Sequence, residues 1–210
     1  MKTLIAVPCM SQVNAEFCSS LAMMQKVGQC VLEMKIGSLI YDARNSLCST
    51  AVKIGADYIL WLDADMVFPS DLLPHMLRVI QENDNIDILT GVYYRRTEPY
   101  TPVLFDCLEQ ETDGQVKWSG FDELPEGLIE VGGCGFGCVL MPTDIIFDIT
   151  AQHGTLFTPF PGAGEDVAFC IRARECGFHI YADPSIKLGH TGYVTVTEDF
   201  YKAYKGQNNG

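Results

Sequence analysis

The sequence predicts an α/β fold in which a mostly parallel sheet is flanked by helices and carries a small antiparallel elaboration. Three observations lead to this fold class. Apolar strand-like runs alternate with helix-like stretches through the first 90 residues. The run at residues 58–62 has the length and composition of a buried strand. Asp113-Gly114, a strong hairpin turn signal, separates two short strand candidates in the middle of the chain.

The first half alternates strand and helix. Short apolar, β-branched runs predict strands at residues 2–8, 29–34, 57–62 and 86–89. Apolar residues at helical spacing predict helices at 14–27, 41–54 and 70–81. Asn14 and Ser70 are expected to cap two of these helices, and Gly55 to end the third. Alternation of this kind predicts a mostly parallel sheet.

The second half is less regular. Strands are expected at 103–108, 115–118, 138–141 and 178–182. The polar, acidic segment 109–126 is expected to be a surface elaboration. Helices are expected at 142–149 and 165–176, joined by a loop at 153–164 that is long enough to form a lid. The glycine-rich segment 132–137 precedes a strand instead of opening a helix, so it is not a dinucleotide fingerprint. Its glycines either let a strand twist sharply or bring the backbone close to a ligand.

Length and composition narrow the possible classes of protein. A chain of 210 residues with 48% hydrophobic content predicts one domain with a sizeable core. No apolar run approaches the roughly 18 residues that span a bilayer, and the first apolar run is too short for a signal peptide. The nine cysteines show no CxxC spacing, and most of them are expected to be reduced core residues. These features predict a soluble, cytoplasmic protein.

The charge balance disfavours two kinds of partner. The net charge is −13, with 27 acidic and 14 basic side chains. Nucleic acid as a general partner and anionic membranes both require a basic face, so neither is expected. Arg95-Arg96 and the Arg172/Arg174 pair are the short arginine clusters of the sequence.

Asp63-Ala64-Asp65 stands where the buried strand must end. A turn after the strand can bring carboxylates at i and i+2 to one ligand, and carboxylate oxygens suit Mg²⁺ or Mn²⁺, often together with substrate phosphates. The alternative is structural, because acidic residues are also ordinary near the start of a helix such as the one that follows.

Two further segments bear on the same chemistry. Glu165 and Asp166 begin a helix that also carries Arg172 and Arg174, and His190 follows the last predicted strand. Each has an ordinary interpretation, since acids at a helix start stabilise its dipole by about 0.3–1 kcal/mol and a lone histidine usually makes a hydrogen bond. Their combination with the two aspartates favours a functional site.

Five segments together resemble the GT-A glycosyltransferases, especially the small family-2-like enzymes. They are the opening strand at residues 3–8, Ala43-Arg44-Asn45, the run at 56–65 that ends in Asp63-Ala64-Asp65, the helix at 164–177 and Gly189-His190. The resemblance covers nearly the whole chain. It implies a single glycosyltransferase domain with a nucleotide-binding half at 1–95, an acceptor half at 96–197 and a polar tail at 198–210.

The resemblance also implies roles for individual residues. Pro8, Arg44, Asp63 and Asp65 are expected to contact a nucleotide-sugar donor, a UDP- or GDP-sugar. Asp65 is expected to bind Mn²⁺ or Mg²⁺ directly, with His190 as a further ligand and Asp63 at the ribose or at the water shell of the metal. Asp166, with Glu165 beside it, is expected to supply the general base. Independently of the resemblance, Arg95 and Arg96, together with the 153–164 loop, are expected on the acceptor side, because they follow the inferred nucleotide half and the loop has glycine and proline hinges.

Several alternatives stay open from the sequence. The first is a nucleotidyltransferase of related fold, although the loop at 9–13 is neither glycine-rich nor basic. The second is a catalytically inactive sugar- or nucleotide-binding module. The acceptor is a glycan, a protein, a small molecule or a modified DNA base. Part of the pattern also resembles retaining mannosyltransferases of the same fold, so the sequence fixes neither the stereochemistry nor the oligomeric state.

Overall fold

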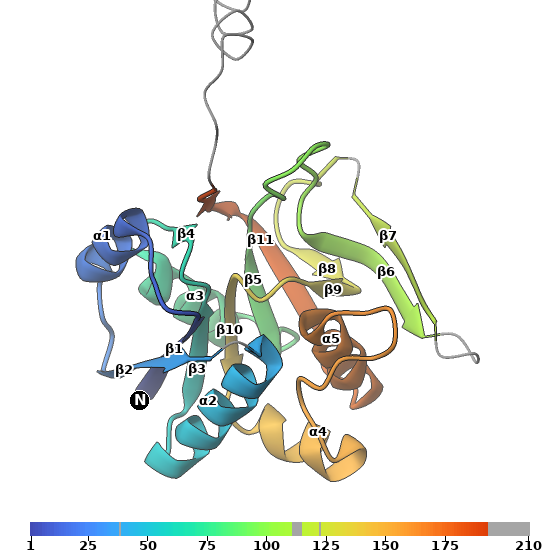
Figure 1. The fold of residues 1–210 in the computed structure, drawn as a ribbon, viewed down its shortest axis with the longest axis horizontal. Helices are drawn as coiled ribbons and strands as arrows, with labels where there is room; N and C mark the ends of the chain where they lie inside the picture. The colour runs from blue at the N-terminus through green and yellow to red at the C-terminus, as the bar shows by residue number, and fades with distance from the viewer. Residues whose placement is uncertain (38, 111–114, 122, 193–210) are drawn as a thin grey trace, which may run out of the picture.

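The computed structural model describes residues 1–37, 39–110, 115–121 and 123–192, and its centre is a seven-stranded sheet (Figure 1). The strand order is β2-β1-β3-β10-β5-β11-β8. The bounds are β1 Lys2–Cys9, β2 Gln29–Ile36, β3 Tyr58–Leu62, β5 Ile88–Val92, β8 Ile129–Val131, β10 Cys138–Pro142 and β11 Ile180–Lys187.

The sheet is mostly parallel, which confirms the predicted fold class. Strands β2, β1 and β3 pair in parallel, and so do β5 and β11. Strand β10 runs antiparallel between β3 and β5, and β8 pairs antiparallel with β11 at one edge. The antiparallel character is therefore not confined to the predicted elaboration, because β10 lies inside the main sheet.

Helices cover both faces of the sheet (Figure 1). Helices α2 (Ile40–Ile54), α4 (Ile145–His153) and α5 (Glu165–Glu175) pack into one hydrophobic cluster, and α1 (Ala15–Met23) and α3 (Leu72–Glu82) pack into another. Alternate residues of β3 enter the two clusters: Ile59 and Trp61 enter the first, and Leu60 and Leu62 the second. Alternation of this kind is expected for a strand buried on both faces. None of the helices within the described ranges combines the length and apolar character needed to cross a bilayer.

Two small antiparallel sheets complete the fold. One has the order β7-β6-β9, with β6 at Leu104–Gln110, β7 at Val116–Gly120 and β9 at Gly133–Cys134. The Asp113-Gly114 turn predicted between β6 and β7 lies outside the described residues, as does the predicted tail at 198–210. The other sheet pairs β12 (Gly189–His190) with β4 (Met66–Val67), and it holds the end of the described chain against the segment after Asp65.

Several predicted element bounds are wrong, for local reasons. The first helix ends at Met23 instead of residue 27, because Met24 is extended and Gln25 donates a backbone hydrogen bond to Ser70. Asp71, not Ser70, occupies the N-cap position of α3. The helix expected at 142–149 begins only at Ile145, since β10 continues through Pro142. Gly55 ends α2 as predicted, in the left-handed conformation at φ 63°.

Candidate active site

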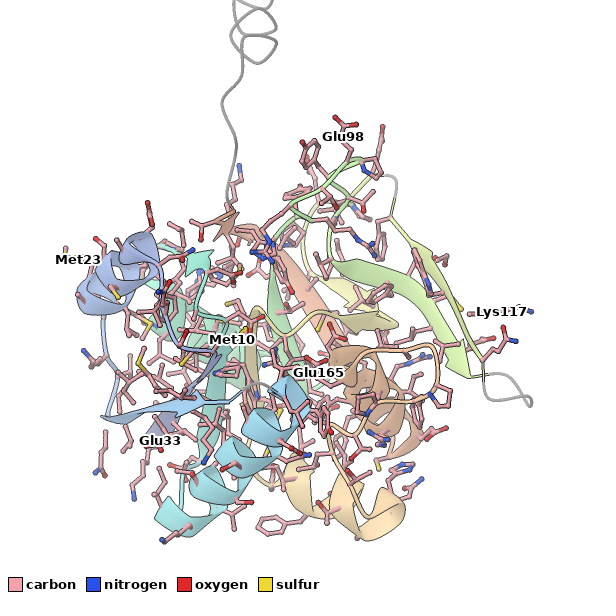
Figure 2. All side chains as sticks on the ribbon, in the orientation of Figure 1. Met10, Met23, Glu33, Glu98, Lys117 and Glu165 are labelled. Atoms are coloured by element: carbon pink, nitrogen blue, oxygen red, sulfur yellow. The ribbon has the colours of Figure 1, made fainter. Side chains whose placement is uncertain are left out.

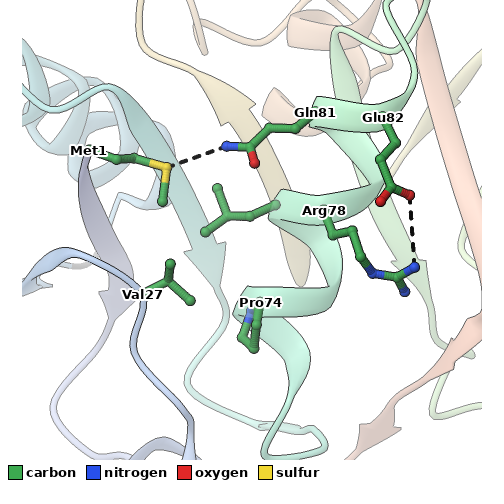
Figure 3. A pocket seen from close by; sticks show the side chains of 7 residues that line it. Met1, Val27, Pro74, Arg78, Gln81 and Glu82 are labelled. Carbon is green, nitrogen blue, oxygen red and sulfur yellow. Dashed lines mark hydrogen bonds and ion pairs between the residues drawn. The ribbon is translucent and has the colours of Figure 1, made fainter.

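A cavity of about 1100 Å³ opens at the carboxyl ends of β1, β2 and β3. Pro8 and Cys9 end β1, Gly37 follows β2 and Asp63 follows β3, and all four line the cavity. Ligands of open α/β sheets bind at this end of the strands. A smaller cavity of about 200 Å³ lies between Met1 and α3, beside an exposed ion pair of Arg78 and Glu82 (Figure 3). Since Met1 precedes β1, the two cavities lie at opposite ends of that strand.

The segment from Asp63 to Asp65 forms a turn between β3 and β4. The Asp63 amide donates to the carbonyl of Gly137 at 3.0 Å, and its carbonyl accepts from Met66 at 3.1 Å. Both carboxylates are half-buried and both residues line the cavity. The turn therefore brings the two acids of the motif to one opening, as the functional interpretation of the motif requires.

Arg44 holds Asp63, the first of these two acids, through a buried ion pair. Its side chain is only 2% exposed, and it contacts Asp63 Oδ1 through Nη2 at 2.9 Å and Glu165 Oε1 through Nε at 3.4 Å. The rings of Trp61, Phe136 and Phe157 lie 5.3 to 5.9 Å from the guanidinium carbon. Burial raises the pKa of the Asp63 carboxyl, and the adjacent guanidinium opposes that shift. Arg44 thus fixes Asp63 in place, while its own contact with a donor stays a prediction.

Asp65 has different partners. Its Oδ2 atom lies 2.9 Å from Arg96 Nη1 and 3.5 Å from His190 Nε2. Its backbone carbonyl accepts from the amide of Thr191 at 2.9 Å and from the hydroxyl of Thr191 at 2.6 Å. The carboxylate therefore meets residues that follow it by 31 and 125 positions in the sequence.

His190 is oriented by three contacts. Its Nδ1 lies 2.9 Å from the carbonyl oxygen of Tyr94, its ring packs edge-on against Tyr93, and its backbone pairs with Met66. A carbonyl only accepts, so Nδ1 carries the hydrogen, and Nε2 is left toward Asp65. The hydrogen bond with Asp65 raises the pKa of His190, and the Tyr94 carbonyl adds to that shift.

These residues fit a divalent metal. Metal-binding histidines commonly donate their other ring nitrogen to a carbonyl, as His190 does to Tyr94. Two atoms that each lie about 2.1 Å from one ion are at most about 4 Å apart, and Asp65 Oδ2 and His190 Nε2 are 3.5 Å apart. In the part of the chain that the structure describes, no three His, Cys, Asp or Glu side chains form a complete metal site. A metal here would therefore also take oxygens from a donor and from water.

Glu165 and Asp166 begin α5, and Glu165 lies beside α2 (Figure 2). Glu165 is bound to Arg44, which connects it to Asp63. Asp166 accepts a hydrogen bond from the amide of Val167 at 2.7 Å. Burial, reinforced by the charge of Glu165, raises the pKa of Asp166 to about 6. A carboxyl with this pKa suits proton transfer near neutral pH.

The two neighbouring arginines lie in different surroundings. Arg96 lines the cavity and contacts Asp65. The guanidinium carbon of Arg95 lies 5.6 Å from the ring of Trp118, a residue of β7 that is 58% exposed. The 153–164 loop contacts neither arginine through a described hydrogen bond. Arg172 holds the first part of this loop, because it donates hydrogen bonds to the carbonyls of Leu156 and Thr158, both at 2.7 Å.

Two residues that help to build the site, Asn14 and Tyr93, could not be recognised from the sequence. Asn14, expected only as a helix cap, makes no side-chain cap and instead donates through Nδ2 to the Thr191 hydroxyl. Tyr93 supports His190 and accepts from the amide of Gly137 at 3.2 Å. A side chain at Gly135 or Gly137 would collide with Tyr93. A glycine-rich segment indicates that another group lies close to the backbone, but the sequence alone does not identify that group, which here is the Tyr93 side chain.

The chain is similar to a known protein family in sequence and to solved structures in fold. Residues 19–146 match the family model for glycosyl transferase family 2. The fold resembles A197 from STIV, with a TM-score of 0.66 and 20% identity over 92% of this chain and 87% of that one. It also resembles GalNAc-T7, solved with UDP, GalNAc and Mn²⁺, with a TM-score of 0.62 and 9% identity over 92% of this chain and 44% of that one. No curated protein matches the sequence.

Proposed function

Because this chain belongs to glycosyl transferase family 2, we propose that it moves a sugar from a nucleotide-diphosphate sugar to an acceptor hydroxyl with the help of a divalent metal. The observation that carries the proposal is the meeting of Asp65 Oδ2 and His190 Nε2 in the cavity at the carboxyl ends of the strands. The Mn²⁺ and UDP recorded with GalNAc-T7, a protein of the same fold, support the choice of ligands.

We assign one group of residues to the metal and the nucleotide-sugar donor, and another group to the acceptor. Asp65 and His190 would hold the metal, which would offset negative charge on the departing diphosphate. Asp63, fixed by Arg44, faces the same cavity and is proposed to bind the ribose or the water shell of the metal. Pro8 and its neighbours at the end of β1 would border the nucleotide.

Asp166 is proposed to act on the acceptor. In an inverting transfer, the acceptor oxygen bonds to the anomeric carbon, the bond from that carbon to the diphosphate oxygen breaks, and Asp166 takes the hydroxyl proton. Glu165 keeps Asp166 in a negative environment and is itself held by Arg44. Arg95, beside the exposed Trp118, is proposed to lie on the acceptor side.

The first test concerns the metal. Asp65→Asn should abolish Mn²⁺-dependent binding of UDP and GDP in calorimetry, since it removes the only carboxylate within reach of His190 Nε2 among the described contacts. Asp84→Asn, at an exposed turn, is the control and should bind like the wild type. Mn²⁺-dependent nucleotide binding that survives Asp65→Asn would refute the proposed metal site.

The second test separates the remaining alternatives. Release of UDP or GDP from a panel of nucleotide-sugars, measured without acceptor, is expected of a transferase with a water-accessible site. An inactive binding module would bind these donors without releasing nucleotide. A nucleotidyltransferase would instead consume a nucleoside triphosphate and release pyrophosphate.

A further inference from the structure

The guanidinium group of Arg96 is already bound to the Asp65 carboxylate. Arg96 Nη1 donates to Asp65 Oδ2 at 2.9 Å and to the carbonyl of Thr191 at 3.2 Å. The oxygen it holds is the same one that faces His190 Nε2 at 3.5 Å. Arg96 and a metal bound by Asp65 and His190 would therefore compete for one oxygen.

The two arginines of the site differ in how firmly they are held. The side chain of Arg44 is 2% exposed and enclosed by aromatic rings, whereas that of Arg96 is 49% exposed. An exposed ion pair contributes little stability, so it exchanges readily. Arg44 is thus a permanent partner of Asp63, and Arg96 is a replaceable partner of Asp65.

The Arg96 side chain also has room and a possible second partner within the cavity. It lines the cavity together with Asp63, Asp65 and the residues after β1. Its aliphatic part packs against Gly192, where a Cβ would lie 3.0 Å from Arg96 Cδ, so glycine leaves room for the side chain. A guanidinium binds phosphate oxygens in a paired, bidentate manner, which makes a diphosphate in this cavity its natural second partner.

We propose that Arg96 is an exchangeable counter-ion, which holds Asp65 in the free protein and moves to the donor diphosphate when a divalent metal takes Asp65. The inference rests on the proposed function and adds to it a residue that positions the diphosphate. It also assigns Arg96 to the donor side of the site, whereas the sequence placed it on the acceptor side.

The exchange couples the two ligands. A metal that binds alone must displace Arg96 and leave it without a partner, whereas a metal that arrives with a diphosphate gives Arg96 a new one. Metal and nucleotide should therefore strengthen each other's binding, by the same factor in both directions.

Arg96→Gln tests the proposal, with Arg95→Gln as the matched control, because both variants remove one positive charge from the same segment. Calorimetry with Mn²⁺ alone should show about two- to fivefold tighter binding to Arg96→Gln, the factor that corresponds to an exposed ion pair. Calorimetry with UDP and GDP at saturating Mn²⁺ should show binding weakened about tenfold or more, because a charge-assisted hydrogen bond to phosphate is lost. Arg95→Gln should change neither affinity.

The opposite signs of the two effects make the test decisive. A merely structural role for Arg96 would lower both affinities or neither, and either result would overturn the proposal. Arg96→Lys keeps the charge and should stay close to the wild type with Mn²⁺ alone. If Asp65→Asn abolishes metal-dependent binding but Arg96→Gln does not tighten Mn²⁺ binding, the exchange is wrong and the proposed function stands. If Asp65→Asn has no effect, the proposed function itself fails.

Discussion

Asp166, the proposed general base, is the residue whose protonation should decide how transfer depends on pH. Burial and the neighbouring charge of Glu165 raise its pKa to about 6, against the opposing hydrogen bond from Val167. A general base must be ionised, so kcat should rise with pH up to about 6 and level off above it. Asp166→Asn should lower transfer by about 10²–10⁴-fold and remove the acidic limb of the profile. Donor binding should stay near normal.

Glu165→Gln provides the internal control for this assignment. Since the charge of Glu165 raises the pKa of Asp166, its removal should move the acidic limb of kcat to lower pH. An acidic limb that persists in Asp166→Asn would assign the titration to another group. The anomeric configuration of the product, determined by NMR, decides whether Asp166 acts as a base, because a retaining transfer does not need one in this position.

The acids of the site could be predicted from sequence because each stands at the end of an element. Asp63 and Asp65 lie in the turn that follows a buried strand, and Glu165 and Asp166 begin a helix. The contacts of Arg96 with Asp65 and of Asn14 with Thr191 could not be predicted, since they join residues 31 and 177 positions apart through surface side chains. Local patterns assigned Asn14 to a helix cap, and tertiary contact overrides that preference.

At the scale of elements, the segment at 133–137 shows how glycine makes room for a side chain that supports the site. A Cβ at Gly137 would lie 2.8 Å from Cζ of Tyr93, the residue that supports the His190 ring. Gly137→Ala should cost about 1–3 kcal/mol of unfolding free energy, the usual penalty of overpacking, and should weaken Mn²⁺ binding. Chemical denaturation and calorimetry measure the two effects.

Gly120→Ala is the matched control for Gly137→Ala. Gly120 lies in β7, and the nearest atom to an added Cβ there is a backbone oxygen at 3.8 Å. Stability and metal affinity should both stay at wild-type values. Equal losses in the two variants would mean that the loss in Gly137→Ala does not come from the collision with Tyr93.

The helices and strands themselves were largely predictable, but the direction of β10 was not. Its apolar residues mark it as a buried strand, and nothing in such a run distinguishes a parallel from an antiparallel neighbour. The structure inserts it antiparallel between β3 and β5. This arrangement brings Gly137, which immediately precedes β10, to the Asp63 amide at the carboxyl end of β3.

For the whole molecule, the ion pair of His75 and Asp183 joins α3 to β11 and should make stability depend on pH. Burial alone would raise the pKa of Asp183, but hydrogen bonds from Ser185 and His75 lower it overall. A depressed pKa stabilises the fold above the unfolded value of about 3.9, and this contribution is lost as the pH falls through the folded value. Asp183→Asn should therefore cost about 1.5–3 kcal/mol at pH 7 and less below about pH 4.

A second His–carboxylate pair serves as the control for Asp183. His179 and Glu130 are each 56% exposed, and exposed pairs contribute little. Glu130→Gln should change the free energy of unfolding by no more than a few tenths of a kcal/mol, as roughly expected for a solvent-exposed pair. Denaturant titrations at pH 7 and at about pH 2, well below the unfolded pKa, would contradict this pH dependence if Asp183→Asn showed the same loss at both.

The site joins distant parts of the chain, so ligand binding should stabilise the molecule as a whole. The metal ligands proposed here come from the segment after β3 and from β12. Among the described residues, the core clusters extend to Ile186 and to Leu188, which packs against them. A chain that ends at Leu188 should therefore fold but lose Asp65's partners His190 and Thr191. A chain that ends at Gly192 keeps both. Only the longer chain should gain thermal stability from Mn²⁺ with UDP or GDP, about 2.7 kcal/mol at 100 times the Kd. Equal stabilisation of both chains would show that the metal is held without β12.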